Sequence, residues 1–382
     1  MSDPLLTPGE SRSLSRIPEL DGVRGLAAFG IVLWHYIPSV VVAQPSTLLA
    51  YVNRALSLSW AGVDLFFVLS GFLIGSILLR AAGSPRYFST FYLRRAARIV
   101  PLYVVMLAGL ALGGLWLQLG APAPVQPLFE SKLPWWSFAI FAQNFFMPGI
   151  DDFGPKFVGV TWSLAVEEQF YLLLPLLIWV VPRRQLGWWL LALFFSAPLL
   201  RVCLQTGMAT YVLLPCRLDS LMAGALLALA WSTPRCRDWM VRGRQWLLVA
   251  WIAIAIPAPI LIRSGAGLYA LRGEFGWLLN TWLAGWFAVT LALLLTGQPL
   301  LGAVFRLRPL RWMGRVAYGL YLLHPAIGWF THWALLGQVP VLNDARTAAV
   351  TMLAASLSLL AAGAAYRWIE EPFITWGQRF KY

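Results

Sequence analysis

Long apolar runs alternate with short polar segments along this chain, and each long run has the length of a membrane-spanning helix. A spanning α-helix needs about 20 predominantly apolar residues. The pattern therefore predicts an all-α, polytopic transmembrane helix bundle of about ten spans. The predicted spans are residues 25–43, 60–79, 99–119, 161–181, 186–204, 215–231, 246–262, 276–296, 312–336 and 347–368.

Two other segments are assigned from their apolar content. Residues 135–146 are apolar but too few to cross a bilayer comfortably, so we expect an interfacial or re-entrant segment. The first 24 residues contain no apolar core, which argues against a cleavable signal peptide. The run that begins at Gly25 is therefore expected to serve as an uncleaved anchor.

The composition agrees with this pattern and excludes a chain of soluble domains. Of the 382 residues, 59% are hydrophobic and 12% are charged, against about 45–50% and 25% in soluble proteins. The mean hydropathy is +0.70. Cys203, Cys216 and Cys236 have neither metal-ligand spacing nor an even count, so we expect no metal site and no disulfide framework.

The net charge of +13 indicates membrane orientation rather than nucleic-acid binding. The basic residues form short clusters between apolar runs, where cytoplasmic loops carry Lys and Arg. With the N-terminus inside, 21 of the 29 basic residues fall on the cytoplasmic side. The other eight are Arg54, Lys132, Lys156, Arg201, Arg217, Arg263, Arg272 and Arg346. This asymmetry predicts that both termini are cytoplasmic and that the number of spans is even.

Ionisable residues inside spans are the best functional candidates, because a charge at the bilayer centre costs at least about 2.5–3.5 kcal/mol. In the first span, Arg24 and His35 are eleven residues apart, close to three helical turns, so they share one face. His35 is expected near the bilayer midplane. The alternative is that His35 only forms an interhelical hydrogen bond and that Arg24 only marks the cytoplasmic side.

The second and sixth spans each open with an aspartate. Asp64 shares a helix face with Gly71 and Gly75, a small-residue packing pair, so it should point into the bundle. Its role is either functional or limited to pairing with a neighbouring Arg or His. Arg217 and Asp219 open the sixth span and are expected near the outer side.

The fourth span carries two adjacent carboxylates, Glu167 and Glu168. Glu167 has Ser163 and Tyr171 one turn away on either side, so we expect it in the interior. Glu168 is expected at a partly solvated edge. Two carboxylates in an apolar span need water, partners or protons, which favours a functional role.

The ninth span places Tyr318, Tyr321 and His324 on one face, followed by Pro325. The proline leaves the Tyr321 carbonyl without its helical partner. His324 is expected either to contact substrate or to be a satisfied packing residue. His332, nearer the outer end, is expected to be interfacial.

At the cytoplasmic start of the third span, Arg95 and Arg98 share a face. Paired guanidinium groups suit phosphate recognition. The alternative is a basic cluster that contacts lipid headgroups.

Seven motifs in this order resemble the acyltransferase-3 family of integral-membrane O-acyltransferases, which includes lipopolysaccharide, peptidoglycan and exopolysaccharide O-acetylase-like members. The resemblance extends from about residue 17 to 376. The motifs are residues 21–28 (DGVRGLAA) followed by His35, 62–72 (GVDLFFVLSGF), 95–98 (RAAR), 162–171 (WSLAVEEQFY), 217–220 (RLDS), 321–325 (YLLHP) and 369–373 (IEEPF).

The resemblance implies an enzyme that moves an acyl group, commonly acetyl, from cytoplasmic acyl-coenzyme A to a hydroxyl of a lipid-linked or cell-surface glycan. It implies catalytic roles for Arg24, His35 and Glu167, and donor binding by Arg95 and Arg98. Acyl-coenzyme A is then a co-substrate, and no tightly bound cofactor is expected. The implied location is the bacterial cytoplasmic (inner) membrane, with other proteins of envelope-glycan synthesis as further partners.

The implied domain organisation is a cytoplasmic tail (1–16), the transmembrane domain (17–376) and a second cytoplasmic tail (377–382). Some family members carry a C-terminal hydrolase-like domain. This sequence ends at Tyr382, so we expect that any dependence on such a domain is met by another protein or is absent.

The residues also fit the chemistry without the family, because an imidazole near its unperturbed pKa can act as a base that a carboxylate orients. We expect a polar column with arginines at the cytoplasmic rim, His35 in the middle, and Asp64, Glu167 and Asp219 above. Whether His35 acts as a base or is acylated stays open. The rival hypotheses are a glycan or lipid transporter or flippase, and an acyltransferase for a small hydroxylated metabolite.

The orientation predicts which sites a membrane-impermeant thiol reagent reaches in intact cells. With the native cysteines replaced, a Cys introduced at Ser89 should be protected, because it lies in an arginine-flanked loop. A Cys introduced at Asp152 should react. Labelling at Ser89 with protection at Asp152 would reverse the predicted orientation.

Overall fold

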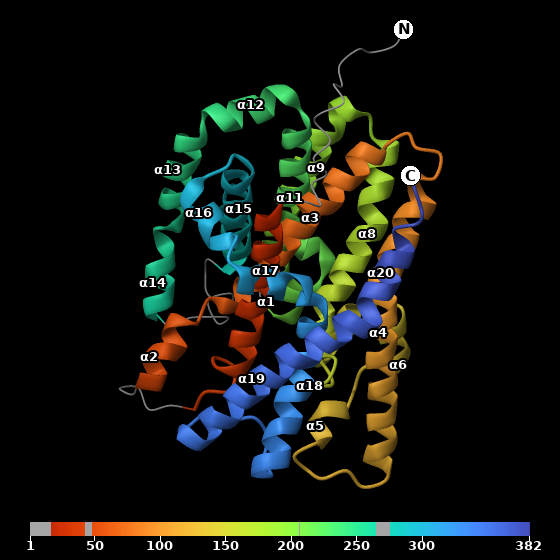
Figure 1. Cartoon of the computed structure of the whole chain (residues 1–382), viewed down its shortest axis with the longest axis vertical. Helices are drawn as coiled ribbons and strands as arrows, with labels where there is room; N and C mark the ends of the chain where they lie inside the picture. The colour runs from red at the N-terminus through yellow and green to blue at the C-terminus, as the bar shows by residue number, and fades with distance from the viewer. Residues whose placement is uncertain (1–16, 43–47, 206, 265–275) are drawn as a thin grey trace.

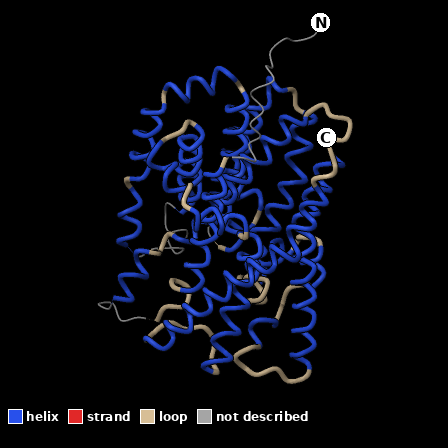
Figure 2. The backbone as a smooth tube through the Cα atoms, in the orientation of Figure 1, coloured by secondary structure: helices blue, strands red, loops and turns tan. Residues whose placement is uncertain are grey.

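The described part of the chain is helical throughout. The computed structural model describes residues 17–42, 48–205, 207–264 and 276–382, so the expected N-terminal tail (1–16) and the basic residue Arg272 lie outside it. Within these ranges the only pairing of extended backbone is an isolated bridge between Val41 and Leu342. Figures 1 and 2 show the resulting helix bundle, with α12 at one end and α5 at the other. The predicted all-α class is confirmed.

The helices follow in chain order, with a π-helical turn over Tyr366–Glu370. Their bounds are α1 (Pro18–Tyr36), α2 (Leu48–Ala55), α3 (Gly62–Ala81), α4 (Tyr87–Gln118), α5 (Gln126–Phe129), α6 (Trp135–Ala139), α7 (Gln143–Ile150), α8 (Trp162–Val180), α9 (Arg183–Leu204), α10 (Met208–Val212), α11 (Leu218–Ser232), α12 (Pro234–Arg242), α13 (Arg244–Ala255), α14 (Pro257–Ser264), α15 (Gly276–Leu295), α16 (Pro299–Phe305), α17 (Arg308–Arg315), α18 (Ala317–Leu336), α19 (Ala345–Ala365) and α20 (Glu371–Gly377).

By length and composition, seven of the described helical segments can cross a membrane, and a further pair bent by 73° raises the number to eight. The bent pair joins α12 to the segment that begins at Arg244. Helices α1 and α18 also have 19 and 20 residues, but they carry more polar side chains. A multi-pass membrane protein is therefore supported, while the count of ten spans stays a prediction.

Helix α1 begins at Pro18, seven residues before the predicted start of the first span at Gly25. The polar residues of its first turns are not a loop. They pack against α17 so closely that a Cβ at Gly25 would overlap the Leu310 carbonyl, and one at Gly314 would overlap the Asp21 carbonyl. The polar first turns of α1 therefore pack directly against the backbone of α17.

Three other predicted boundaries also change. Helix α4 has 32 residues, so the arginines near its start are helical rather than part of a loop. The predicted span 312–336 is broken at Val316 into α17 and α18, and the span 246–262 is broken at Ile256. Residues 135–146 contain the short helix α6 and the first half of the short helix α7, in agreement with the prediction that they do not span.

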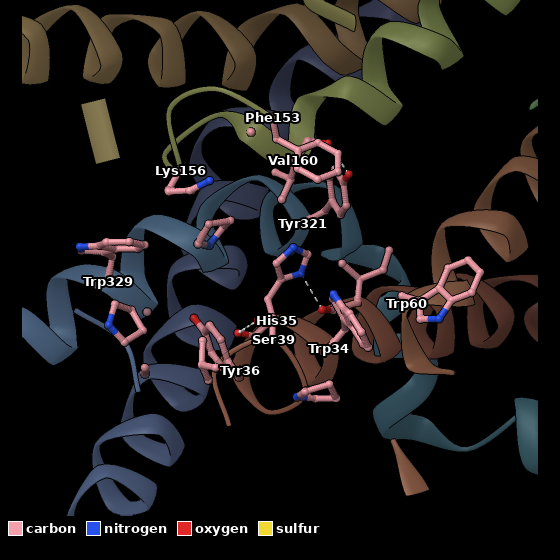
Figure 3. A pocket seen from close by; sticks show the side chains of 18 of the residues that line it. Trp34, His35, Tyr36, Ser39, Trp60, Phe153, Lys156, Val160, Tyr321 and Trp329 are labelled. Atoms are coloured by element: carbon pink, nitrogen blue, oxygen red, sulfur yellow. Dashed lines mark hydrogen bonds between the residues drawn. The ribbon is translucent and has the colours of Figure 1, made fainter. Parts of the chain in front are cut away.

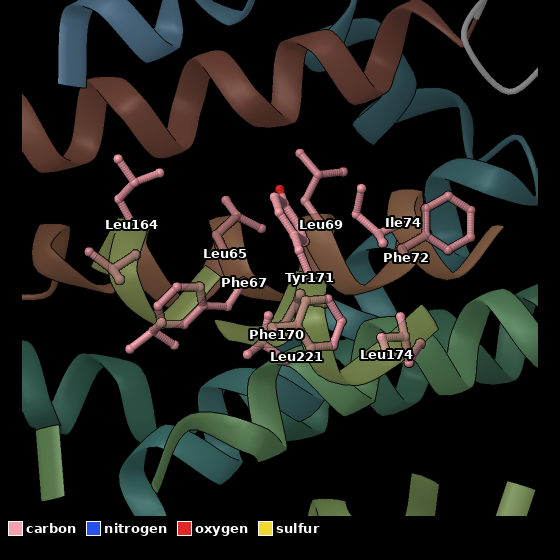
Figure 4. Packing of buried hydrophobic residues seen from close by; sticks show 14 of the residues in the cluster. Leu65, Phe67, Leu69, Phe72, Ile74, Leu164, Phe170, Tyr171, Leu174 and Leu221 are labelled. Atoms are coloured by element: carbon pink, nitrogen blue, oxygen red, sulfur yellow. The ribbon is translucent and has the colours of Figure 1, made fainter. Parts of the chain in front are cut away.

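Helix α3 lies at the centre of the bundle between α8 and α11. Figure 4 shows its apolar side chains packed against those of α8 and against Leu221 of α11. A Cβ at Gly71 would overlap the Leu221 carbonyl, and a Cβ at Gly224 would overlap the Val68 carbonyl. The prediction that Gly71 lies at a close helix contact and that Asp64 faces the interior is confirmed, since Asp64 is 0% exposed.

This contact predicts that Gly224→Ala destabilises the protein. The added methyl group has no room beside the Val68 carbonyl, and overpacking of this kind costs about 1–3 kcal/mol. Thermal unfolding in detergent measures the effect. Gly285→Ala in α15 is the control, because nothing lies within 4 Å of the place that its new methyl group would take and alanine favours the helix. Equal stability of the two variants would contradict the close α3–α11 contact.

Candidate active site

Two cavities meet inside the bundle, and three residues line both of them. The large cavity has a volume of about 690 Å³ and the small cavity about 110 Å³. The shared residues are Ile31, Val63 and Tyr321. The predicted site residues are divided between the two: His35 lines the large cavity, whereas Arg24, Glu167 and the donor-binding candidate Arg98 line the small one.

His35 projects from the end of α1 into the large cavity (Figure 3). Its Nδ1 lies 2.9 Å from the carbonyl oxygen of Ile31. Because a carbonyl only accepts hydrogen bonds, Nδ1 carries the proton and Nε2 keeps its lone pair. The backbone thereby fixes the tautomer that a general base needs.

His324 lies next to His35, with the two ring centroids 4.8 Å apart. It is 0% exposed. Its Nδ1 lies 3.1 Å from the Leu320 carbonyl oxygen, and its Nε2 has no partner among the described residues. The Tyr36 hydroxyl donates to the His324 carbonyl at 2.6 Å. His324 is therefore brought to the site, where it packs beside the proposed base.

Glu167 is held in the small cavity by two hydroxyl groups. The Ser70 hydroxyl donates to its Oε1 at 2.5 Å, and the Tyr171 hydroxyl donates to the same oxygen. We expected a carboxylate to orient the His35 imidazole. The Ile31 carbonyl orients it instead, because it accepts the hydrogen bond from Nδ1. Glu167 instead shares its cavity with Arg24 and Arg98.

The arginines of α4 have different surroundings. Arg94 donates to the Phe380 carbonyl and lies over the Tyr382 ring, so it holds the C-terminal segment. Arg95 and Arg98 form no ion pair with any described residue, although the charges of Arg24 and Arg95 both act on Arg98. Arg24 pairs with Asp21 at 2.9 Å, and the charge of Glu370 also acts on Arg98, so within the described residues only Arg95 and Arg98 of this group lack a direct ion pair.

Tyr321 and Glu168 complete the polar groups near the junction of the cavities. The Tyr321 hydroxyl donates to the Val160 carbonyl at 2.5 Å and lies 2.5 Å from the Ser163 hydroxyl. Glu167 and Glu168 are both half-buried, so the expected contrast between an interior and an edge position does not appear. Oε1 of Glu168 is buried without a partner among the described residues.

Asp64 and Asp219 form buried ion pairs and line neither cavity. Asp64 accepts from Arg217 at 2.7 Å, and Asp219 accepts from Arg201 at 2.6 Å. All four side chains are at most 2% exposed. The two aspartates therefore hold the bundle together through arginine partners and do not face the cavity that His35 lines. Arg201 and Arg217, counted as outer charges, are likewise buried partners within the bundle rather than loop residues.

Aromatic rings enclose Arg217 and continue into the wall of the large cavity. The guanidinium carbon lies 5.4 Å, 5.3 Å and 6.0 Å from the ring centroids of Phe67, Tyr211 and Trp162. Burial raises the pKa of Tyr211, although Arg217 opposes the shift. The hydroxyl of Tyr211 therefore stays neutral and available as a hydrogen-bond donor.

The composition alone leaves two interpretations of the 21 tryptophans: stacking on sugars, or the simpler one, an interfacial belt. Several of the tryptophans face the large cavity. Spacing along one helix gives no signal for this, because the wall combines residues from distant segments. The aromatic lining residues are Trp34, Tyr36, Trp60, Phe153, Trp162, Tyr211, Tyr321 and Trp329.

Comparison with known proteins gives a consistent result along nearly the whole chain. Residues 17–367 match the family profile described as an acyltransferase domain. The peptidoglycan O-acetyltransferase OatA of Listeria monocytogenes is 28% identical over 96% of this chain and 58% of its own length. YrhL of Bacillus subtilis, named as a candidate peptidoglycan O-acetyltransferase, is 27% identical over 95% of this chain and 56% of its own length.

Similar matches occur in Staphylococcus aureus. A candidate O-acetyltransferase of strain COL is 25% identical over 95% of this chain and 58% of its own length. The chain thus spans a little over half the length of these relatives. No solved structure matches the chain significantly.

Proposed function

This chain belongs to the acyltransferase-3 family, whose acyltransferase domain it matches over residues 17–367, and on that premise we propose that it is a membrane O-acetyltransferase. The donor we propose is acetyl-coenzyme A, and the acceptor is a hydroxyl of a cell-surface or lipid-linked glycan. The observation that carries the proposal is a pair of cavities that share Ile31, Val63 and Tyr321, one lined by Arg24 and Arg98 and the other by His35 and aromatic side chains.

The small cavity, which Arg24 and Arg98 line, fits the donor. Arg98 and Arg95, one helical turn earlier on α4, offer guanidinium groups that suit the phosphates of coenzyme A. Arg24 lies about 16 Å from His35 along α1. In this proposal the phosphopantetheine arm of the donor extends from the arginines toward the imidazole, while the nucleotide stays at the arginine-rich end.

The large cavity fits the acceptor. Its volume of about 690 Å³ lies in the range of small-molecule sites. Its aromatic rings offer flat surfaces on which sugar rings pack, and Lys156 and Ser39 add polar groups. Relatives named as peptidoglycan O-acetyltransferases support a glycan as the acceptor.

The chemistry at His35 follows from its tautomer. Nε2 accepts the proton of the acceptor hydroxyl as the oxygen attacks the thioester carbonyl. The bond between carbon and sulfur then breaks, and the departing thiolate takes the proton from Nε2. In a two-step route the same Nε2 would be acylated first. The Ile31 carbonyl holds the ring in place in either case.

The same proposal fixes the membrane orientation. We propose that the arginine-rich end faces the cytoplasm, where the donor is made, and that both termini lie there. The large cavity then faces the opposite side of a bacterial cytoplasmic membrane, where other proteins of envelope-glycan synthesis supply the acceptor. The family match favours a transferase over the transporter or flippase hypothesis.

Replacing Arg95 or Arg98 with Gln should raise the KM for acetyl-coenzyme A. Each charge-assisted hydrogen bond is worth about 1.5–3 kcal/mol, which corresponds to about ten- to a hundredfold. Initial rates with purified protein in detergent measure it. Arg184→Gln, an exposed residue at the same end, is the control and should leave the KM unchanged. If the KM for acetyl-coenzyme A is unchanged in both single variants, Arg95 and Arg98 do not bind the donor and contribute only to membrane topology.

His35→Gln should abolish transfer while donor binding persists. The amide keeps a hydrogen-bonding group but accepts no proton at neutral pH, and general base catalysis contributes about a hundred- to ten-thousandfold. Radiolabelled acetyl transfer gives the rate, and equilibrium binding of coenzyme A shows that the site is intact. Turnover above about a tenth of the normal rate would contradict the assignment and move attention to His324.

A further inference from the structure

A basic hollow lies at the corner between α12 and α13, where α12 closes one end of the bundle (Figure 1). Its volume is about 440 Å³, within the range of small-molecule sites. The axis of α12 is bent by 73° from the helical segment that begins at Arg244, so α12 turns away from the direction of that span. The hollow is lined by Arg235, Asp238, Trp239, Arg242, Gly243 and Trp246.

One face of α12 carries most of these lining residues away from the bundle. Arg235, Asp238, Trp239 and Arg242 are separated by three, four and seven residues, which places them on the same side of the helix. All four are exposed. Met240, in contrast, is 6% exposed and belongs to the apolar core. The lining face is therefore turned toward the surroundings of the bundle.

Hydrogen bonds hold the corner in one arrangement. The backbone N–H of Gly243 donates to the Trp239 carbonyl at 2.8 Å and ends α12. Just after this turn, the Arg244 guanidinium donates to the carbonyl oxygens of Gly297 at 3.2 Å and Thr296 at 3.5 Å. Arg244 thus ties the corner to the end of α15, and the walls of the hollow are fixed before any ligand binds.

The charges of the hollow are not compensated within the protein. Arg235, Arg242 and Asp238 form no ion pair with any described residue, so the lining carries two positive charges and one negative charge. Guanidinium groups two turns apart on one face suit the oxygens of a phosphate group. The carboxylate accepts hydrogen bonds. The lining therefore fits a ligand with an anionic phosphate and nearby hydroxyl donors.

The two tryptophans indicate where such a ligand comes from. Trp239 and Trp246 are each 69% exposed, and exposed tryptophans of membrane proteins are typical of the headgroup level of the bilayer. Helices with a basic polar face and exposed tryptophans lie in this layer. A phospholipid therefore presents its phosphate at the depth at which the hollow opens.

We propose that the hollow binds an anionic phospholipid whose headgroup carries hydroxyl groups, as that of phosphatidylglycerol does. The phosphate oxygens accept hydrogen bonds from Arg235 and Arg242, and a glycerol hydroxyl donates to Asp238. The net positive charge of the lining favours this lipid over zwitterionic phosphatidylethanolamine. The hollow shares no lining residue with either of the two internal cavities, so the lipid site is separate from the site of transfer.

Photocrosslinking of the purified full chain in phosphatidylcholine nanodiscs tests this site. A trace of photoactivatable phosphatidylglycerol is added, and mass spectrometry of the digested protein measures adducts on residues 234–246. Unlabelled phosphatidylglycerol should displace the adducts at a concentration about fivefold lower than phosphatidylethanolamine does, the effect of one charge near a membrane surface. Arg235→Gln and Arg242→Gln should each weaken phosphatidylglycerol binding about fivefold for the same reason.

Arg237→Gln is the matched control, because it removes one exposed positive charge from the same helix without changing the lining of the hollow. It should leave the adducts unchanged. Asp238→Asn should not weaken phosphatidylglycerol binding, because the amide oxygen still accepts a hydrogen bond. Equal losses in Arg237→Gln and the two lining variants would show a general effect of surface charge and overturn the site. Equal displacement by the two lipids, or adducts only outside residues 234–246, would overturn it as well.

Discussion

Charged groups buried in an apolar bundle must be compensated, and two ion pairs meet this constraint at the centre of the molecule. Asp64 of α3 pairs with Arg217, and Asp219 of α11 pairs with Arg201 of α9. Removing one partner of such a pair typically costs about 3–5 kcal/mol. The pairs therefore fix how α3, α9 and α11 meet. The rings around Arg217 carry this order into the wall of the large cavity, through Trp162 and Tyr211.

The polar groups outside these pairs define the site because they are not compensated. Nε2 of His35 keeps a free lone pair, and Arg95 and Arg98 form no ion pair among the described residues. Each of these groups suits a part of one of the two proposed substrates, the reacting hydroxyl or the phosphates. The ion-paired charges stabilise the helix bundle. The groups without a partner are available to bind substrates and to react.

The helices are predictable from the sequence because membrane spans and interior glycines leave local signals. The spacing of Gly71 and Gly75 predicts a close helix contact on this face of α3. The contact between Gly71 and the Leu221 carbonyl confirms it. The start of α1 is not predictable in this way, because its polar first turns are buried by α17, almost 300 residues later in the chain. The partners of Asp64 and the burial of His332, which is 2% exposed rather than interfacial, escape prediction for the same reason, since periodicity gives the face of a helix but not what packs against it.

The central claim is that donor and acceptor approach His35 from opposite cavities. A structure determined by electron cryomicroscopy with a non-reactive thioether analogue of acetyl-coenzyme A tests it most directly. The account predicts density for the phosphates at Arg95 and Arg98, with the pantetheine arm in the small cavity and the acetyl carbonyl beside Nε2 of His35. An analogue bound within the large cavity, or with its phosphates away from both arginines, would contradict it.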